Sequence, residues 1–159
     1  MPETPLDQAL RMLTYGVYVI TTAQDGQEEA FLTPWLSQVS LQPPLLALSV
    51  ASDLPAHDLL VGGAPFVVNV LKAGQKTLAD LFSQPALEGE PLRGQPSSRA
   101  RNGCPYLSEA LVFLECDAAG RLDTGRDSTL VIGSPTSATV LSEGHPLTVR
   151  QTGMDPLRR

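Results

Sequence analysis

Short runs of β-branched and aromatic residues, separated by turn signals, constrain this fold more than any other feature of the sequence. Two such runs cover residues 17–22 and 30–35, with the turn signal Asp25-Gly26 between them. Further runs that we predict as strands cover 45–51, 66–71, 111–116, 129–132, 136–141 and 147–150. Because the strands do not alternate with long helices, they favour an antiparallel sheet over a parallel one. The pattern predicts a mainly β fold whose sheet closes into a barrel, with helices at its ends.

Helical spacing is confined to short segments. Thr4 suits the N-cap of a first helix, Pro5 suits its first position, and Gly16 is predicted to end it. One apolar face of that helix is formed by Leu6, Leu10 and Leu13. Two more short helices are predicted within 53–63 and 75–82. The helices are too few and too short to form a layer of their own.

Length and charge exclude several classes of protein. The chain of 159 residues is the size of one domain, which we predict to cover 1–159. A net charge of −6 with two lysines argues against a nucleic-acid partner, because phosphate-backbone binding needs clustered basic residues. The apolar run at 45–51 is far too short to cross a membrane, so no membrane partner is expected. Residues 1–5 lack the basic start and apolar core of a secretory signal, and we expect a cytoplasmic protein.

Cysteine and arginine positions give little chemistry by themselves. Cys104 and Cys116, with two histidines in the chain, do not form a zinc-binding pattern, and no metal site is expected. Their spacing is not a Cys-x-x-Cys motif, so we interpret them as small apolar side chains of the core. Residues 84–105 are polar, rich in Pro and Gly, and predicted to be a long loop that carries Arg93, Arg99 and Arg101. These arginines either gather an anionic substrate or are solvated, and the second interpretation is favoured.

Several segments, in order along most of the chain, resemble the flavin reductase-like family of FMN-binding split barrels. The segment 16–22 (GVYVITT) is similar to the opening strand of that family, and 37–45 (SQVSLQPPL) is similar to its S-x-VS-x-x-PPL signature. The segment 66–79 is similar to F-V-V-N-V-L-x-x-x-Q-x-x-L-A. Later in the chain, 103–116 and 127–133 resemble two further strands of the family, the second of them its GDH-x-L-x-I-G strand. The segment 35–44 is especially similar to the C-terminal domain of cyanobacterial-type flavodiiron proteins.

The resemblance implies a fold, a cofactor and a binding site. The implied fold is an antiparallel split β-barrel with short flanking helices, and the implied cofactor is FMN, with FAD as the alternative. NAD(P)H is the implied electron donor, and relatives form homodimers with the flavin near the subunit interface. Main-chain amides and hydroxyls are the expected phosphate ligands because basic side chains are few. The residues placed around the flavin are Leu32, Thr33, Pro34, Trp35, Leu36, Ser37, Ser49, Val50, Ala51, Ser52, His57, Asn69 and Gln75.

The sequence departs from the family pattern at three places. Relatives commonly carry Thr and Ser where Leu32 and Pro34 stand, so two hydroxyl groups near the flavin are missing, and Pro34 also lacks a backbone N–H. Ser128 occupies the position of the GDH histidine, which is often linked to nicotinamide use, and Arg126 that of its glycine. These departures bear on how efficient a reductase the chain is and on whether NAD(P)H is its donor.

Several candidate residues have a structural interpretation beside the functional one. Trp35 is a platform for the flavin ring or an aromatic of the core or dimer interface, and the two are even. Asn69 contacts flavin or satisfies local backbone groups, with a lean toward flavin, and Gln75 is evenly divided between flavin and the first turn of its helix. His57 is a solvated residue at a helix start more often than a phosphate ligand, and His145 is expected to be structural.

Two functions from different classes follow. The first is an oxidoreductase that transfers hydride from NAD(P)H to bound flavin and passes electrons to free flavin or another acceptor, such as a partner monooxygenase. No side chain is then required as a general acid or base, so no catalytic residue is named. The second is a flavin-binding or flavin-less module without turnover that serves a redox partner. The order of the motifs favours the first, and Leu32, Pro34 and Ser128 favour the second.

Overall fold

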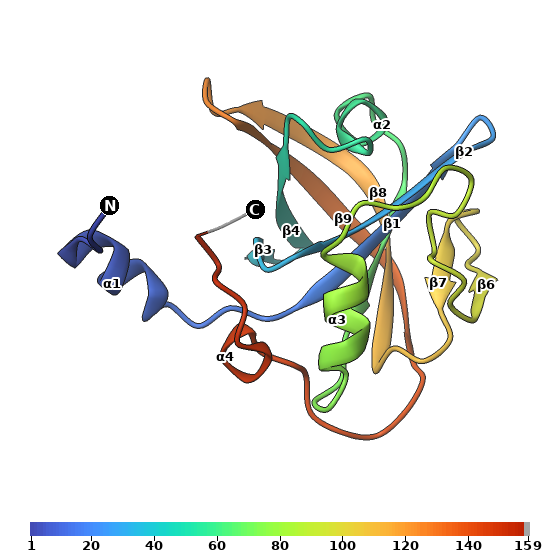
Figure 1. Ribbon diagram of the computed structural model, residues 1–159. Helices are drawn as coiled ribbons and strands as arrows, with labels where there is room; N and C mark the ends of the chain where they lie inside the picture. Colours follow the sequence, from blue (N-terminus) through green and yellow to red (C-terminus); the bar gives the residue numbers. More distant parts are fainter. Residues whose placement is uncertain (158–159) are drawn as a thin grey trace.

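The computed structural model describes residues 1–157 and shows a single curled antiparallel sheet with short helices around it (Figure 1). The seven strands of the sheet lie in the order β2-β1-β5-β8-β9-β4-β3. Their bounds are β1 Tyr18–Gln24, β2 Gln27–Thr33, β3 Leu36–Leu41, β4 Pro44–Ala51, β5 Phe66–Val70, β8 Val112–Asp123 and β9 Ser128–Val140. Two three-residue strands, β6 Ser97–Arg99 and β7 Pro105–Leu107, form a separate hairpin. The predicted mainly β, antiparallel class is confirmed.

The way in which the sheet closes is set by one short connection. The edge strands β2 and β3 stand at opposite ends of the strand order, yet only Pro34 and Trp35 separate them in the chain. Two residues reach about 10 Å at most between the strand ends. The ends of the sheet must therefore meet, and the sheet curls into a barrel that is split between β2 and β3, where no ladder of hydrogen bonds joins them. We call this place the seam.

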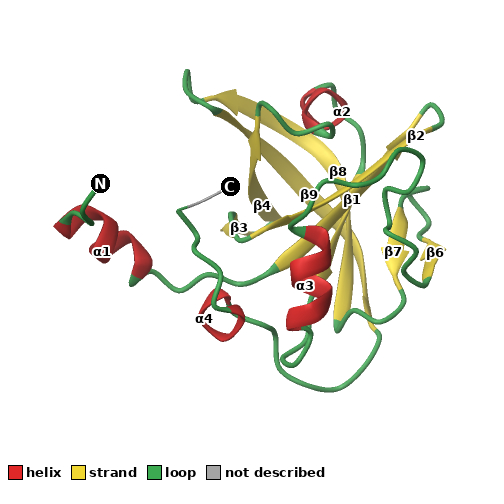
Figure 2. Cartoon of the chain, viewed as in Figure 1, coloured by secondary structure: helices red, strands yellow, loops and turns green. Residues whose placement is uncertain are grey.

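Residues 1–157 include four short helices outside the sheet: α1 Pro5–Arg11, α2 His57–Val61, α3 Lys76–Phe82 and α4 Val149–Thr152. The cartoon coloured by secondary structure shows α3 and α4 beside the strands and α1 projecting away from them (Figure 2). α1 begins at the predicted cap Thr4, whose hydroxyl accepts the Asp7 amide at 3.1 Å while the Asp7 carboxylate accepts the Thr4 amide. The helix ends at Arg11, earlier than predicted.

The core has two main clusters of buried side chains. The strands and α2 enclose one of them, which includes Ile20, Leu48 and Phe66. The other lies where α3 and α4 meet the strands, and it includes Leu71 and Phe82. β1 is buried on both faces, which explains why its apolar residues form a continuous run. The Asp25-Gly26 turn adopts positive φ at both residues, as a tight hairpin requires.

Several predicted boundaries were wrong for identifiable reasons. β3 was missed because its residues are mixed and none is buried, as expected of an edge strand. The strands predicted at 129–132 and 136–141 are the single strand β9, which passes Pro135 at an irregularity in the pairing, where a residue without an N–H is tolerated. The predicted strand at 147–150 is instead the start of α4, capped by Thr148. The predicted loop 84–105 contains β6 and the first residue of β7.

Candidate functional site

The candidate residues at 33–37 form the seam of the barrel. Thr33 is buried, and its hydroxyl accepts the backbone N–H of Trp35 at 3.0 Å, which tightens the turn around Pro34. The carbonyl of Trp35 in turn accepts the backbone N–H of Ser49 from β4 at 3.0 Å. The seam is therefore fixed to the end of β4, and the structure brings these two predicted segments together.

β4 divides its candidate residues between two faces. Val50 is completely buried in the inner core, so it can offer a ligand only its backbone. Ser49 is half-buried and points the opposite way, onto the outer face of the sheet, together with Ala47. Ser37 pairs with Ala47 and therefore shares that face. The outer face thus presents two hydroxyls, from Ser37 and Ser49, close to the seam.

A second polar group lies at the end of the barrel that α2 closes. His57 is the first residue of α2, its side chain is 18% exposed, and its Nε2 lies 3.1 Å from the hydroxyl of Thr129. Its Nδ1 lies 3.3 Å from a carboxylate oxygen of Asp58. The amide and hydroxyl of Ser52 both donate to the carbonyl of Asp127, at 2.9 and 3.1 Å. The ends of β4 and β9 and the start of α2 therefore meet here.

Thr129 is the residue of this group that the sequence interpretation missed. It pairs with Val50 in the sheet and is nearly buried, with its hydroxyl directed at His57. Its position directly after Ser128, in the segment that resembles GDH-x-L-x-I-G, was the available signal. Ser128 itself pairs with Ala51, so the substituted histidine position does lie beside the end of β4.

Of the two interpretations of Asn69, the structure favours the one in which its side chain satisfies backbone groups of the protein. Its side chain is completely buried, and its amide group donates to the carbonyl of Val19 at 2.9 Å and to the hydroxyl of Thr21 at 3.1 Å. Its oxygen accepts the backbone N–H of Leu107 at 2.8 Å. With its polar atoms engaged inside the protein, Asn69 joins β1, β5 and β7 and offers no group to a ligand.

Gln75 and Leu32 also have contacts within the protein that account for them. The side chain of Gln75 accepts the backbone N–H of Lys72 at 2.7 Å and donates to the carbonyl of Glu109 at 2.6 Å, which fixes the loop before α3. Leu32 packs against the core cluster of α3 and α4, and Leu36 packs against the inner core. Leu32 thus supplies core packing.

The arginines of the loop 84–105 hold that loop in place. The guanidinium of Arg93 donates to the carbonyls of Ala30 and Gln84, both at 2.8 Å, and lies 4.8 Å from the ring centre of Phe82. Burial lowers the pKa of Arg93. Arg99 pairs with Glu28 and donates to the carbonyl of Gly103. The loop is therefore tied to β2 and α3, and Arg93 and Arg99 already have partners.

The two cysteines are unpaired and fully buried, as expected for core side chains. Burial raises the pKa of the Cys116 thiol from 9.0 to about 12, with smaller contributions from the charges of Asp117 and Glu115. Burial likewise raises the pKa of Cys104. Neither environment favours the thiolate that redox or nucleophilic chemistry requires.

The pKa of Cys116 predicts a loss of stability in alkali. A thiol whose pKa is raised by folding stabilises the native state below its unfolded pKa of 9.0, and this contribution disappears as the pH rises toward 12. Between these two pH values, we expect the free energy of unfolding of the wild type to fall by about 1.4 kcal/mol more per pH unit than that of Cys116→Ala, which has no thiol at this position. Urea unfolding at about pH 10 and 11 measures both slopes. Parallel slopes would contradict the assignment.

The candidate set fits an amphipathic ring better than a metal ion. Hydroxyls of Ser37 and Ser49 on a partly apolar outer face suit the mixed edges of a flavin, and His57 suits its phosphate end. Among residues 1–157, no three His, Cys, Asp or Glu side chains lie close enough to hold a metal.

The same part of the chain contains no helix long and apolar enough to cross a membrane. None of the candidates lines the two clefts beside α1, whose volumes are about 770 and 310 Å³.

Comparison with known proteins identifies the family of this chain. Residues 10–158 match the model of the flavin reductase like domain. Diflavin flavoprotein A 1 of Synechocystis sp. is 31% identical over 123 residues, which are 76% of this chain and 22% of that protein. The chain spans about a quarter of the length of the curated relatives that it matches.

Solved structures of similar fold are themselves named as flavin enzymes. The styrene monooxygenase flavin reductase of Pseudomonas putida S12 is 25% identical with a TM-score of 0.79, over 94% of each chain. The NADH:FAD oxidoreductase of Streptomyces globisporus is also 25% identical with a TM-score of 0.79, over 93% of this chain and 91% of its own. The family match covers the seam, the end of β4 and the start of α2 together, and this chain therefore belongs to the flavin reductase like family.

Proposed function

We propose that this chain binds FMN at the seam of its barrel and transfers hydride from NAD(P)H to that flavin, with free flavin or a partner enzyme as the acceptor. The observation that carries the proposal is the group of hydroxyls at Ser37 and Ser49, on a partly apolar face beside the seam between β2 and β3. FAD is the alternative cofactor. The bound flavin supplies the electron-accepting ring, and the protein supplies binding, orientation and electrostatics.

The residues of the chain have separable tasks in this proposal. Trp35 and the turn at Pro34 form the wall at the seam, while Ser37 and Ser49 hydrogen-bond the polar edge of the ring. His57, at the barrel end closed by α2, is the side chain proposed to face the phosphate, while the amide and hydroxyl of Ser52 hold the end of β4 to the carbonyl of Asp127. Thr129 fixes the orientation of the His57 imidazole through the contact at 3.1 Å. We retain the main-chain groups of Val50 and Ala51, and we assign Leu32, Asn69 and Gln75 to structural support.

The open position of this site supports a homodimer. Ser37 and Ser52 are exposed and Ser49 is half-buried, so a single chain leaves one side of a bound ring in water. A second copy on this face would exclude that water, as sites of this chemistry require. We also propose that the chain forms one domain over 1–159 and works in the cytoplasm, where two unpaired thiols and reduced nicotinamide are expected.

Absorbance of the purified protein tests the proposal directly. We expect a flavin band near about 450 nm after addition of FMN and gel filtration, and bleaching of that band when NADH or NADPH is added without oxygen. Protein that binds neither FMN nor FAD would overturn the proposal. Protein that binds flavin but is not reduced by either nicotinamide would support the alternative of a module without turnover, which the packing of Leu32 against the core favours.

A charge at Ser49 tests the location of the site. Ser49→Asp is expected to weaken FMN binding about tenfold or more. The new carboxylate and the phosphate of FMN would repel each other by about 1.7 kcal/mol at a separation of about 10 Å and an effective dielectric constant of about 20. Quenching of flavin fluorescence measures the dissociation constant. Ser108→Asp, at an exposed serine of the loop after β7, adds the same charge elsewhere and serves as the control. Equal effects of the two variants would remove Ser49 from the site.

A further inference from the structure

The N-terminal arm, residues 1–14, is folded but leaves most of its apolar side chains exposed. Its helix α1 contains no buried residue, and the side chains of Leu6, Met12 and Leu13 are 65%, 70% and 56% exposed. An isolated helix of this length is not stable in water without packing of one face. The reciprocal capping by Thr4 and Asp7 stabilises its first turn only. The apolar face of α1 therefore needs a partner surface.

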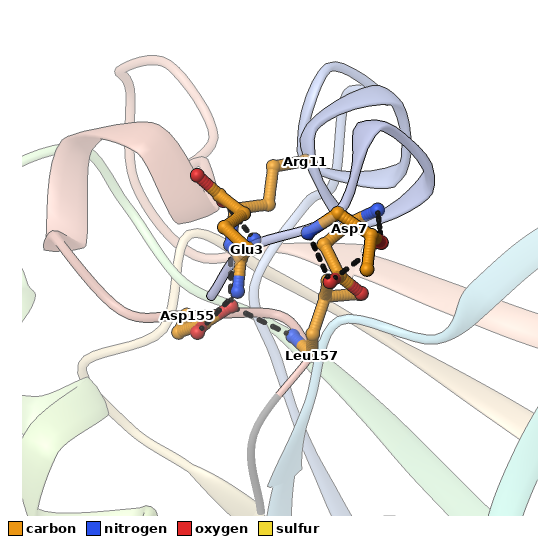
Figure 3. A network of polar contacts seen from close by, with 6 residues as sticks. Glu3, Asp7, Arg11, Asp155 and Leu157 are labelled. Carbon is orange, nitrogen blue, oxygen red and sulfur yellow. Dashed lines mark hydrogen bonds and ion pairs between the residues drawn. The ribbon is translucent and has the colours of Figure 1, made fainter. Parts of the chain in front are cut away.

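A polar clasp sets the direction in which the arm leaves the barrel. Two nitrogens of Arg11 donate to the two carboxylate oxygens of Asp155 at 3.1 and 2.9 Å, and a third pairs with Glu3 (Figure 3). The pairing with Asp155 raises the pKa of Arg11. A cleft of about 770 Å³ lies beside this clasp, and residues 11–15 and 148–156 contribute its lining. Within its own chain, α1 is thus held by charged groups, while Leu6 stays exposed and Leu10 is half-buried.

The same chain carries an apolar sheet surface without a cover. We call it the outer patch, and it comprises Leu45, Ala47, Leu122, Leu130 and Ile132 on β4, β8 and β9. The register places Ala47 beside Ile132, and Leu122 beside Leu130, so these side chains share the outer face of the sheet. Leu122 is 61% exposed and the others are half-buried. Within residues 1–157, none of them belongs to a core cluster.

We propose that α1 of one copy docks on the outer patch of a second copy, and that the contact is reciprocal. Around a twofold axis, the arm and the outer patch of each copy are both covered in one closed dimer, and exchange of such an element is a low-cost route to a dimer. The family match begins at residue 10, so most of α1 lies outside the matched domain. This position is expected of an element that adds a contact to that domain. This inference gives the proposed homodimer its surface.

The docked arm also reaches the candidate flavin site. Ser49 pairs with Leu130, a residue of the outer patch, and Ser37 pairs with Ala47, another. An arm across these residues covers the side of the site that a single chain leaves exposed. The partner copy therefore supplies part of the wall around the proposed flavin.

Charged substitutions on either surface test the contact. The arm variant is Leu6→Glu with Leu13→Glu, and the patch variant is Leu122→Glu with Leu130→Glu. Each is expected to raise the dimer dissociation constant about 100-fold or more in sedimentation equilibrium, because burial of one leucine is worth about tenfold. Val140→Glu and Leu87→Glu introduce the same change at apolar residues that are 78% and 74% exposed, and should leave the dimer intact. Circular dichroism and thermal melting confirm that the variants are folded.

Mixing the two variants separates this proposal from a general effect of charge. Neither variant can make the contact with itself, but in the mixture the intact arm of the patch variant meets the intact patch of the arm variant. We expect the mixture to form heterodimers with one of the two contacts. Folded variants that stay monomeric when mixed, variants that stay dimeric alone, or a monomeric wild type would overturn the proposal. Wild-type protein that binds no flavin but passes these tests would overturn the proposed function only.

Discussion

Replacing Asn69 with leucine is expected to lower the free energy of unfolding by about 3 kcal/mol or more. The change removes three buried hydrogen bonds and leaves the backbone N–H of Leu107 without its acceptor. An orphaned buried donor costs about 1–3 kcal/mol, and the lost bonds to β1 add to that cost. Chemical unfolding followed by tryptophan fluorescence of Trp35 measures the change.

Asn69→Asp is the matched variant because it has nearly the same shape. It keeps the acceptor for Leu107 but loses the two donors and places a carboxylate in a fully buried site. Burial raises the pKa of such a carboxylate, so the penalty should be small below about pH 4 and grow as the pH rises. If Asn69→Leu unfolds like the wild type and loses only flavin affinity, then Asn69 is a ligand and the structural assignment fails.

Gly133→Val is expected to cost about 3 kcal/mol or more by overfilling the core. A Cβ atom at this position would lie 2.5 Å from the Cζ of Phe66 and 3.3 Å from the Cβ of Cys116, and both neighbours are completely buried. A close-packed interior cannot move a phenyl ring aside without strain. This contact gives a physical reason for a glycine at the end of the segment that resembles GDH-x-L-x-I-G.

Two further substitutions test whether contact with Phe66 causes the loss of stability in Gly133→Val. Phe66→Leu combined with Gly133→Val should recover part of the loss, giving a favourable coupling energy in a double-mutant cycle. Ala138→Val places the same side chain at an exposed position of the same strand and should change stability by no more than about 0.5 kcal/mol. Additive effects of Phe66→Leu and Gly133→Val would contradict a steric clash between the two residues.

Patterns of local sequence predicted most of the sheet. The runs around β1, β4 and β5 are rich in β-branched residues because these strands are heavily buried, and Asp25-Gly26 marks their first hairpin. β3 has no such signal, because an edge strand with no buried residue is not selected for an apolar pattern. α4 was mistaken for a strand since a four-residue helix is too short to show helical spacing.

The candidate site was predicted as a set of segments, and the structure divides that set by side-chain direction. Consecutive residues of a strand face opposite ways, so Ser49 and Val50 cannot both turn toward a ligand. The resemblance located both without that distinction. Asn69 and Gln75 could not be assigned from the sequence because their partners, Leu107 and Glu109, lie more than thirty residues away along the chain.

The seam also leaves two strand edges with free backbone groups, and β2 and β3 differ in how they are protected. β2 carries Glu29, whose charge opposes pairing of another strand with it, and the carbonyl of Ala30 on β2 already accepts a hydrogen bond from Arg93. β3 has an irregular register between Gln38 and Ser40, which interrupts the straight edge that a further strand would need. Because neither edge pairs readily with a strand of another molecule, we expect the protein not to form fibres through its sheet edges at high concentration, and β2 and β3 stay unpaired at the seam.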